Sequence, residues 1–378
     1  MSGDRIRGAF AGLAVGDAAG WPAARHRAAL HAPWSRRLHR ELDAFAEERQ
    51  VTTLPVPFAL NQPVAPLRIG PSDDAEWLAW TLLTIDRPRA DAFRDLVPSR
   101  PGAGLPGAPA PIRARISVAT ALDNLANGVE PPASGHDNPH HFDDAAAIRA
   151  VAFGALGRDP TEDAKVTNAG DGVLAAQAMA AAVSAAVTSG PASAAESGAG
   201  PGAGPGAGPV TGPVTGPVTG PVTGPVTGPV TGPAARAVAA AVEAALAVLP
   251  EDTAIGHNAR LALSVARKAG DPFAAVPALD AALLDHVYSY GVGAAQTVPV
   301  ALALAEAAGG EFTRAVPAAA CLASLADSAP ALTGALTGAC GGYGAIPEGW
   351  TATARTLSGC CLPDLAGRDL IELLEGIA

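Results

Sequence analysis

The sequence has few aromatic residues, few charged residues and almost no lysine. Of its 378 residues, 4% are aromatic and 16% are charged, and the lysines are Lys165 and Lys268 alone. Acidic residues outnumber basic ones by 36 to 25, and the net charge of −11 argues against general nucleic-acid binding through a basic surface. No run of 18 uncharged, strongly apolar residues is present, so we expect no membrane-spanning helix.

Cysteine is scarce too, and its placement excludes two common uses. The four cysteines are Cys321, Cys340, Cys360 and Cys361, with the last two adjacent and no Cys-x-x-Cys spacing. This pattern fits neither a disulfide framework nor a structural zinc site. We therefore expect a reduced, cytoplasmic protein.

Glycine and proline are abundant, with 43 and 35 residues, and they gather in one tract. Ser189–Pro233 is built of Gly, Ala, Pro and Ser followed by tandem Pro-Val-Thr-Gly units over Pro209–Gly232. Proline at every fourth position removes backbone donors, and the tract offers nothing to bury. It predicts a flexible insertion at 189–233 within a single domain spanning 1–378. Two helical domains joined by the tract are the alternative.

Both sides of the tract show helical periodicity, which predicts an all-α fold. Ile6, Phe10 and Leu13 share one face of a first helix rich in glycine and alanine. Val51–Phe58, with its alternating prolines, suggests an extended or hairpin segment. Further predicted helices are Arg36–Arg49, Asp73–Ile85, Ile112–Asn127, Ala145–Leu156, Gly172–Val187, Ala234–Leu249, Ala254–Lys268, Phe273–Val287, Ala294–Ala308, Phe312–Leu325, Ala329–Ala339 and Arg368–Ile377.

Two acidic clusters directly precede apolar helical runs: Ser72-Asp73-Asp74 with Glu76, and Asp327-Ser328. One interpretation is helix capping, because Asp73 and Glu76 have capping-box spacing and Ser328 precedes Ala329-Pro330. The other is that two helix N-termini meet and their oxygens hold a hard cation such as Mg²⁺. The sequence leaves both interpretations open.

Three weaker candidates remain. His140-His141 with Asp143-Asp144 suggests a transition-metal site, although a solvated loop explains the same residues. Gly341-Gly342-Tyr343-Gly344 suggests a place for adenine or ribose, although a tight turn explains the glycines equally well. The basic residues Arg25, Arg27, Arg36, Arg37 and Arg40 suggest attraction of a diphosphate, or an ordinary solvated surface.

Several ordered segments together resemble the ADP-ribosylglycohydrolase family, which includes dinitrogenase-reductase-activating glycohydrolase and the ADP-ribosyl-acceptor hydrolases. Residues 5–20, RIRGAFAGLAVGDAAG, resemble its opening helix, and Ser72-Asp73-Asp74 stands where the family has Thr-Asp-Asp. Ala146-Ala147-Ile148-Arg149 resembles its middle Ala-Met-Arg motif. The C-terminal signature is matched by Asp327-Ser328, Gly334-Ala-Leu-Thr-Gly338, Gly344, Ile346-Pro347 and Trp350. The resemblance implies an orthogonal multi-helix bundle with a Mg²⁺-lined cleft that hydrolyses ADP-ribose linkages.

The sequence also departs from the family pattern. Ala24 stands where the family has a metal-binding Glu, Leu325 stands for the first of two C-terminal aspartates, and Thr167-Asn168 replaces a Thr-His pair. The resemblance therefore implies one magnesium site held by Ser72, Asp73, Asp74 and Asp327. The second ion's site is impaired, and there Ser328 retains the hydroxyl of the family's Thr.

From this resemblance we expect a magnesium-dependent glycohydrolase in which Asp73, Asp74 and Asp327 are catalytic. Its partner would be an ADP-ribosylated protein or a small molecule that contains ADP-ribose. Because two carboxylates are missing, a catalytically impaired protein that binds ADP-ribose or a nucleotide on the same scaffold is the alternative. A helical scaffold that uses these acids only as caps is a third.

Overall fold

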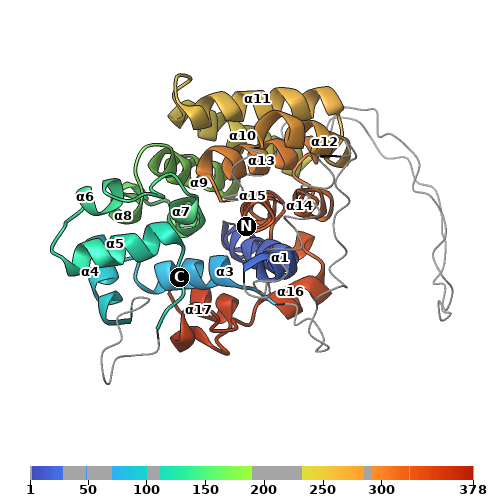
Figure 1. Cartoon of the computed structure of the whole chain (residues 1–378). Coiled ribbons are helices and arrows are strands. Elements are labelled where there is room, and N and C mark those ends of the chain that lie inside the picture. The colour runs from blue at the N-terminus through green and yellow to red at the C-terminus, as the bar shows by residue number, and fades with distance from the viewer. Residues whose placement is uncertain are drawn as a thin grey trace, which may run out of the picture.

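The computed structural model describes residues 2–28, 48, 70–99, 111–189, 232–284, 292–322 and 324–377, without the side chains of 21–28. Among these residues there are sixteen α-helices and three short 3-10 helices. The described ranges contain no strand, only isolated bridges that pair Asp143 with Gly293 and Thr356 with Asp369. The all-α prediction is confirmed, and Figure 1 shows the helices crossing one another in stacked layers.

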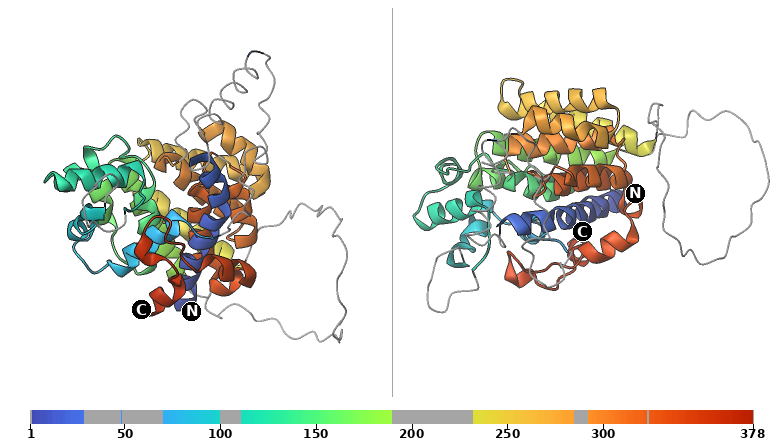
Figure 2. Two further views of the ribbon diagram at one scale, coloured as in Figure 1. Left: turned by 60° about the horizontal axis from the view of Figure 1, so that its bottom comes forward. Right: turned by 45° about the vertical axis from the view of Figure 1, so that its right-hand side comes forward.

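Two helices that are far apart in the sequence form the centre of the molecule. Helix α1 (Ser2–Ala28) and helix α15 (Ala329–Gly341) lie side by side (Figures 1 and 2). A Cβ atom on Gly12 would lie 2.1 Å from the carbonyl oxygen of Gly334, and one on Gly334 would lie 2.0 Å from that of Gly12. The two backbones therefore touch at a distance that only glycine allows. This contact fixes the middle of α1 beside the N-terminal half of α15.

On one side of this pair lie the helices of the central and outer layers, which pack through alanine-rich faces. Helices α7 (Ala145–Ala155), α9 (Asp171–Thr188) and α10 (Pro233–Val248) pack beside one another, and α9 and α10 contact α15. Outside them α11 (Ala254–Ala269) packs on α13 (Ala294–Ala307), with α12 (Pro272–Leu283) and α14 (Phe312–Ala320) alongside. Small buried side chains let these helices approach closely.

On the other side lie shorter helices. Helix α3 (Asp73–Leu83) contacts α1 and α7, and α5 (Ile116–Ala126) lies near the short helices α4 (Arg89–Arg94), α6 (Ala133–His136) and α8 (Thr161–Thr167). The chain ends with α16 (Glu348–Ala354) and α17 (Leu370–Glu375), which both contact α1. The short helices α4, α6, α8 and α16 were not predicted, because one or two turns carry too little periodicity to register.

Most predicted helices are present, with shifted ends. The helix expected over Ile112–Asn127 begins at Ile116, and the one expected to reach Leu325 ends at Ala320. The helix expected over Phe273–Val287 ends at Leu283. The predicted segments 36–49 (apart from Glu48), 51–58 and nearly all of 189–233 lie outside the described residues.

Helix α9 is long and apolar enough to cross a membrane, judged by length and composition alone. It is the only such helix in the described ranges, and 56% of its apolar window is buried inside the bundle. Its contacts with α7 and α10 are those of a core helix, and the same length and composition suit that role.

Candidate functional site

The N-termini of four helices meet around one side chain, that of Arg115. The N-cap residues of α3, α5, α7 and α15 are Ser72, Arg115, Asp144 and Ser328. The guanidinium Nη2 of Arg115 lies 2.6 Å from Asp74 Oδ1 and 2.6 Å from Ser328 Oγ, and its Nη1 pairs with Asp144 Oδ1. The two acidic segments predicted to meet, 72–74 and 327–328, therefore do meet, and an arginine bridges them.

We call Asp73, Asp74, Arg115, Asp144, Asp327 and Ser328 the Arg115 cluster. The side chains of Asp74 and Asp144 are 1% and 0% exposed, whereas that of Asp73 is 18% exposed. Asp73 Oδ2 lies 3.6 Å from the Nε of Arg115, and Asp327 is also only half-buried. The cluster therefore has two buried carboxylates, those of Asp74 and Asp144, and two partly exposed ones, those of Asp73 and Asp327.

Burial shapes the charges of the cluster. It raises the pKa of Asp74 well above the usual range, against the opposing attraction of Arg115. Burial likewise raises the pKa of Asp144 to about 7, again opposed by Arg115. For Arg115, burial disfavours the cation, but the carboxylates of Asp144, Asp74, Asp73 and Asp327 outweigh it and raise the pKa. Arg115 is thus a fixed positive charge among acids.

Asp17, in the middle of α1, anchors the start of α3. Its Oδ2 accepts hydrogen bonds from the backbone nitrogens of Ser72 at 2.7 Å and Ala75 at 3.0 Å, and its Oδ1 accepts one from the Ser72 hydroxyl. Burial, helped by the charge of Asp73, raises the pKa of Asp17 to about 8, although these hydrogen bonds oppose the shift. Asp17 directly follows Gly16, which lies on the face of α1 that contacts α15. This contact therefore fixes the position of Asp17 and, through its hydrogen bonds, the start of α3.

The capping interpretation is right for the position of Ser328, which is the N-cap residue of α15 with Pro330 in the first turn, but not for the hydrogen bonds. Neither Ser72 nor Ser328 makes a side-chain cap to its own helix. Glu76 does not turn back toward Ser72. Instead its Oε1 accepts from Ser358 Oγ and Cys360 N, and its Oε2 accepts from the backbone nitrogens of Cys361 and Leu362. Glu76 is the buried anchor of the 358–362 loop.

The magnesium ion implied by the resemblance can be compared with these residues. The donors are carboxylate and hydroxyl oxygens, which suit Mg²⁺ in kind. Several of these donors are already engaged, however, because the Arg115 guanidinium binds one oxygen of Asp74 and the Ser328 hydroxyl, while the Ser72 hydroxyl binds Asp17. The guanidinium also brings a positive charge to the place between them that a divalent ion would occupy. In the described part of the chain, the compact metal-competent group is Glu76 with Cys360 and Cys361, and Asp73, Asp74 and Asp327 form none. As arranged here, the predicted ligands do not fit a divalent ion.

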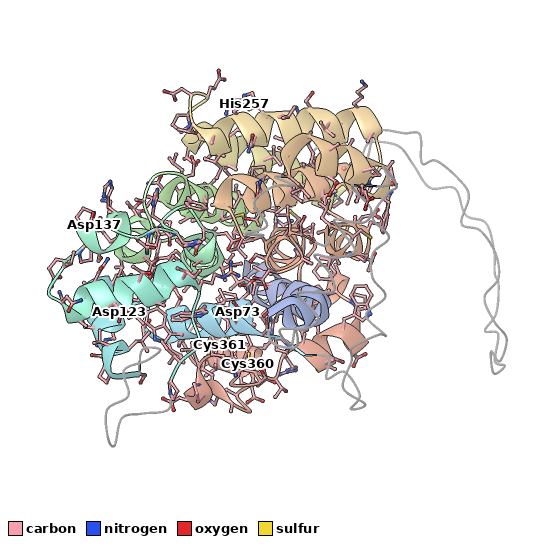
Figure 3. All side chains as sticks on the ribbon, viewed as in Figure 1. Asp73, Asp123, Asp137, His257, Cys360 and Cys361 are labelled. Atoms are coloured by element: carbon pink, nitrogen blue, oxygen red, sulfur yellow. The ribbon has the colours of Figure 1, made fainter. Side chains whose placement is uncertain are left out.

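The Glu76–Cys360–Cys361 group is compact, but its atoms are poor ligands. Both Glu76 oxygens are already hydrogen-bonded, and the two sulfur atoms lie 3.9 Å apart. The hydrogen bond with Cys360, and then burial, raise the pKa of the Cys361 thiol, and a protonated thiol binds metal weakly. Figure 3 marks both cysteines near Asp73, in the loop that Glu76 anchors.

The predicted His140-His141 and Asp143-Asp144 group does not assemble as one site. His141 Nδ1 lies 2.9 Å from the Asn138 carbonyl oxygen, whereas Asp144 pairs with Arg115. Asp143 accepts a hydrogen bond from Asn168 Nδ2 at 3.0 Å. Of the two acids, Asp144 thus belongs to the Arg115 cluster and Asp143 binds Asn168. The two histidines are not part of the Arg115 cluster.

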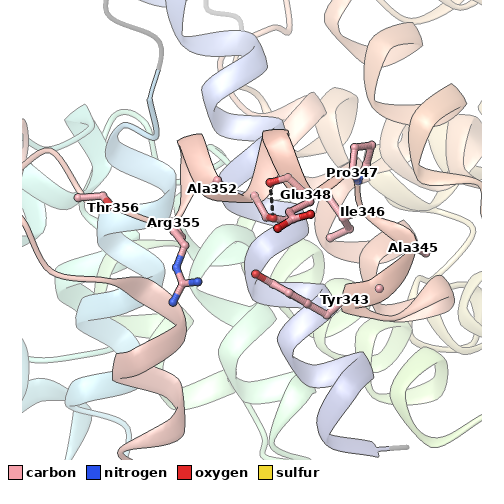
Figure 4. Close-up of a pocket in the computed structure, with 10 residues that line it drawn as sticks. Tyr343, Ala345, Ile346, Pro347, Glu348, Ala352, Arg355 and Thr356 are labelled. Carbon is pink, nitrogen blue, oxygen red and sulfur yellow. Dashed lines mark hydrogen bonds between the residues drawn. The ribbon is translucent and has the colours of Figure 1, made fainter. Parts of the chain in front are cut away.

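The glycine-rich segment 341–344 lies at a separate cavity. Tyr343 and Gly344 line it together with Glu348 and Arg355, and its volume is about 640 Å³ (Figure 4). None of its lining residues belongs to the Arg115 cluster. Contact of Tyr343 with the adenine or ribose of a substrate stays a prediction. The basic residues of 25–40 have no described side chains.

Sequence reasoning missed Arg115 and Asp17, and it weighed Asp144 only as part of a histidine site. One signal was present for Arg115. It stands at the N-terminus of an apolar helix, where the helix dipole disfavours a cation, so it needs nearby acids. Asp17 is likewise an acid inside an apolar helical run, which predicts a buried partner.

Comparison with known proteins can now be set beside this geometry. The sequence profile of the ADP-ribosylglycohydrolase family matches residues 2–377. The chain belongs to this family. The ADP-ribosylglycohydrolases are glycosyl hydrolases, and the whole described fold lies inside the matched range. A search of curated proteins finds no match to the chain.

Proposed function

We propose that this ADP-ribosylglycohydrolase cleaves an ADP-ribosyl linkage at the Arg115 cluster, where Asp73 and Asp327 face the substrate. The supporting observation is that these two half-buried carboxylates lie beside the buried guanidinium of Arg115, where the N-termini of four helices meet. The profile match over residues 2–377 supplies the class of linkage.

The proposed reaction needs negatively charged side chains close to the anomeric carbon of the substrate. Cleavage of a glycosidic bond develops positive charge there, and neighbouring carboxylates stabilise it. A water molecule forms the new bond to this carbon as the bond to the leaving group breaks, and a proton of the water passes to a carboxylate such as that of Asp73. That carboxyl group then returns the proton to the leaving group, so the protein ends in its starting state. Arg115 holds Asp74 and lies beside Asp73, so both carboxylates keep their positions without repelling each other apart.

The test is turnover of three substrates: ADP-ribosyl-arginine, ADP-ribosyl-serine and O-acetyl-ADP-ribose, each with Mg²⁺ and with EDTA. We expect one of them to be hydrolysed, and Asp73→Asn to lower kcat by about 100-fold or more. Asp137→Asn is the matched control, because Asp137 is exposed at the C-terminal end of α6, where its side chain pairs with His136. Figure 3 shows it on a different helix from Asp73. Equal loss in both variants, or no turnover at high enzyme concentration, would contradict the proposal.

The alternative is a protein that binds ADP-ribose without cleaving it. The observation in its favour is Leu325, which stands where the family has an aspartate and is buried in the core at 1% exposure. Calorimetric titration with ADP-ribose separates the two functions. A binder gives an isotherm, and chromatography then shows no product from any of the three substrates.

A further inference from the structure

We propose that Arg115 is the resident cation of this site and takes the place of a divalent ion between α3 and α15. The proposal concerns the same cluster as the proposed function and depends on it only for location. It follows from the position of one guanidinium among groups that the resemblance assigned to magnesium.

The contacts of Arg115 are those of a bridging ion. A single nitrogen, Nη2, is 2.6 Å from Asp74 Oδ1 and from Ser328 Oγ, so it joins the first residues of α3 and α15. Nη1 binds Asp144 at the start of α7. The guanidinium thus ties three other helices to α5, which begins at the next residue. Arginine suits this role because its planar fork presents several donors in fixed directions.

The two buried carboxylates of the site each have a positive partner in the absence of a metal ion. Asp74 and Asp144 are buried, and each forms a direct ion pair with Arg115. The N-terminal ends of α3, α7 and α15 add partial positive charge around the same carboxylates. A divalent ion entering between Asp74 and Ser328 would have to displace the guanidinium and overcome its charge.

Ligand atoms would become free if the guanidinium were withdrawn. Asp74 Oδ2 and Asp144 Oδ2 are buried and have no hydrogen-bond partner among the described residues. Without Arg115, their partner oxygens and the hydroxyl of Ser328 would be unpaired as well. Buried carboxylates left without a counterion either take up protons or bind another cation, and a divalent ion competes with protons for them. Loss of Arg115 should therefore create a metal site.

The experiment counts Mn²⁺ bound per chain by electron paramagnetic resonance, and repeats the titration with Mg²⁺ by calorimetry. The proteins are the wild type, Arg115→Gln, the double variant Arg115→Gln/Asp74→Asn, and Asp74→Asn alone. Arg89→Gln is the matched control, because Arg89 is also buried and paired with an aspartate, Asp163, outside the cluster. Melting temperatures are recorded with EDTA and with each metal.

We expect no tight equivalent in the wild type and an unchanged melting temperature in EDTA. Arg115→Gln should bind one equivalent at least about tenfold more tightly than the wild type, and its melting temperature should rise with metal. The double variant and Arg89→Gln should not gain this site. If Arg115→Gln folds only with metal present, that result supports the proposal as well.

Two results would overturn the proposal. One is a tightly bound Mn²⁺ ion in the wild type that is lost in Asp74→Asn. This result would overturn the proposal even if Arg115→Gln does not fold. The other is a folded Arg115→Gln protein that binds no more metal than the wild type. Neither result depends on turnover, so the proposal can fail while the proposed function holds, and the reverse.

Discussion

Asp144 and Arg149 lie close together on the same helix, yet they belong to two buried clusters with opposite charge balance. At the start of α7, Asp144 is one of several carboxylates around a single guanidinium, that of Arg115. Further along α7, Arg149 and Arg89 share one carboxylate, that of Asp163. The first cluster has a surplus of acid and the second a surplus of base.

The surplus charge is accommodated differently in the two clusters. Around the second, aromatic rings cover the guanidinium groups: Arg89 lies 5.1 Å from the ring centre of Trp80, and Arg149 lies 5.1 Å from that of Phe93. Such cation–π contacts stabilise a buried cation without a second acid. In the first, Asp74 Oδ2 and Asp144 Oδ2 have no partner among the described residues, and Asp73 reaches solvent.

The difference is the one expected between a structural cluster and a candidate functional site. The Asp163 cluster is closed, because Arg149 and Asp163 are at most 1% exposed and aromatic rings lie against the two arginines. The Arg115 cluster leaves buried oxygens of Asp74 and Asp144 without a partner in the described part of the chain, next to the partly exposed Asp73, a feature typical of binding and catalytic sites. The following predictions test this contrast, beginning with the variant of largest expected effect.

Asp163→Asn should destabilise the protein by about 3–5 kcal/mol, because it leaves two buried guanidinium groups without a counter-charge. Urea denaturation of the wild type and the variant measures this. Asp74→Asn is the matched comparison, since Arg115 keeps Asp144 and Ser328 as partners and an excess acid is removed. Its free energy of unfolding should change by less than about 1 kcal/mol. Equal destabilisation by the two variants would mean that the charge balance of the clusters is not opposite.

Removing a neutral hydroxyl should also destabilise the protein more in the Asp163 cluster than in the Arg115 cluster. Thr167 Oγ1 accepts a hydrogen bond from Arg149 Nη2 at 2.7 Å, and Arg149 Nη1 has no partner among the described residues. Thr167→Val should therefore destabilise the protein by about 1.5–3 kcal/mol, the usual worth of a hydrogen bond to a charged group. Ser328→Ala should destabilise it by less than about 1 kcal/mol, because Arg115 Nη2 keeps Asp74 as a partner.

Thermal and urea denaturation of these two variants should be compared in one buffer without divalent ions. A larger loss in Ser328→Ala than in Thr167→Val would show that the Ser328 hydroxyl, and not the surrounding carboxylates, holds Arg115. That outcome would also weaken the contrast between an acid-rich and a base-rich cluster.

The sequence predicts the fold well because the signals that decide it are local. Alanine-rich periodic runs predict the long helices α7, α9, α10 and α11, which the structure contains with ends shifted by a residue or so. The spacing of Gly8, Gly12, Gly16 and Gly20 also marks one face of α1, although its contact with α15 joins segments at opposite ends of the chain. Short helices held by tertiary contacts carry no such signal.

The site was predictable in part only. The resemblance identifies Asp73, Asp74, Asp327 and Ser328, and the structure brings their segments together. Their partner, Arg115, lies in another segment, and nothing in its local pattern says which acids it meets. Glu76 has the spacing of a capping box, yet it binds a loop near the C-terminus. Spacing in the sequence fixes the neighbours along a helix, whereas contacts across the fold require the positions of other helices.

A partly exposed ion pair provides the smallest expected effect and a reference for the two buried clusters. Asp369 caps α17 by accepting hydrogen bonds from the backbone nitrogens of Ile371 and Glu372, and its other oxygen pairs with Arg355. Burial alone would raise the pKa of Asp369, but these hydrogen bonds outweigh it and lower the pKa. A lowered pKa means that the stabilisation is complete above the unfolded-state value of about 3.9 and is lost as the pH falls through the folded-state value.

Asp369→Ala should therefore lower the free energy of unfolding by about 1 kcal/mol at pH 7. The difference from the wild type should shrink as urea denaturation is repeated from pH 5 down to about pH 3. A difference that stays constant over this range would mean that the carboxylate charge of Asp369 contributes nothing, and that the loss comes from packing at the start of α17.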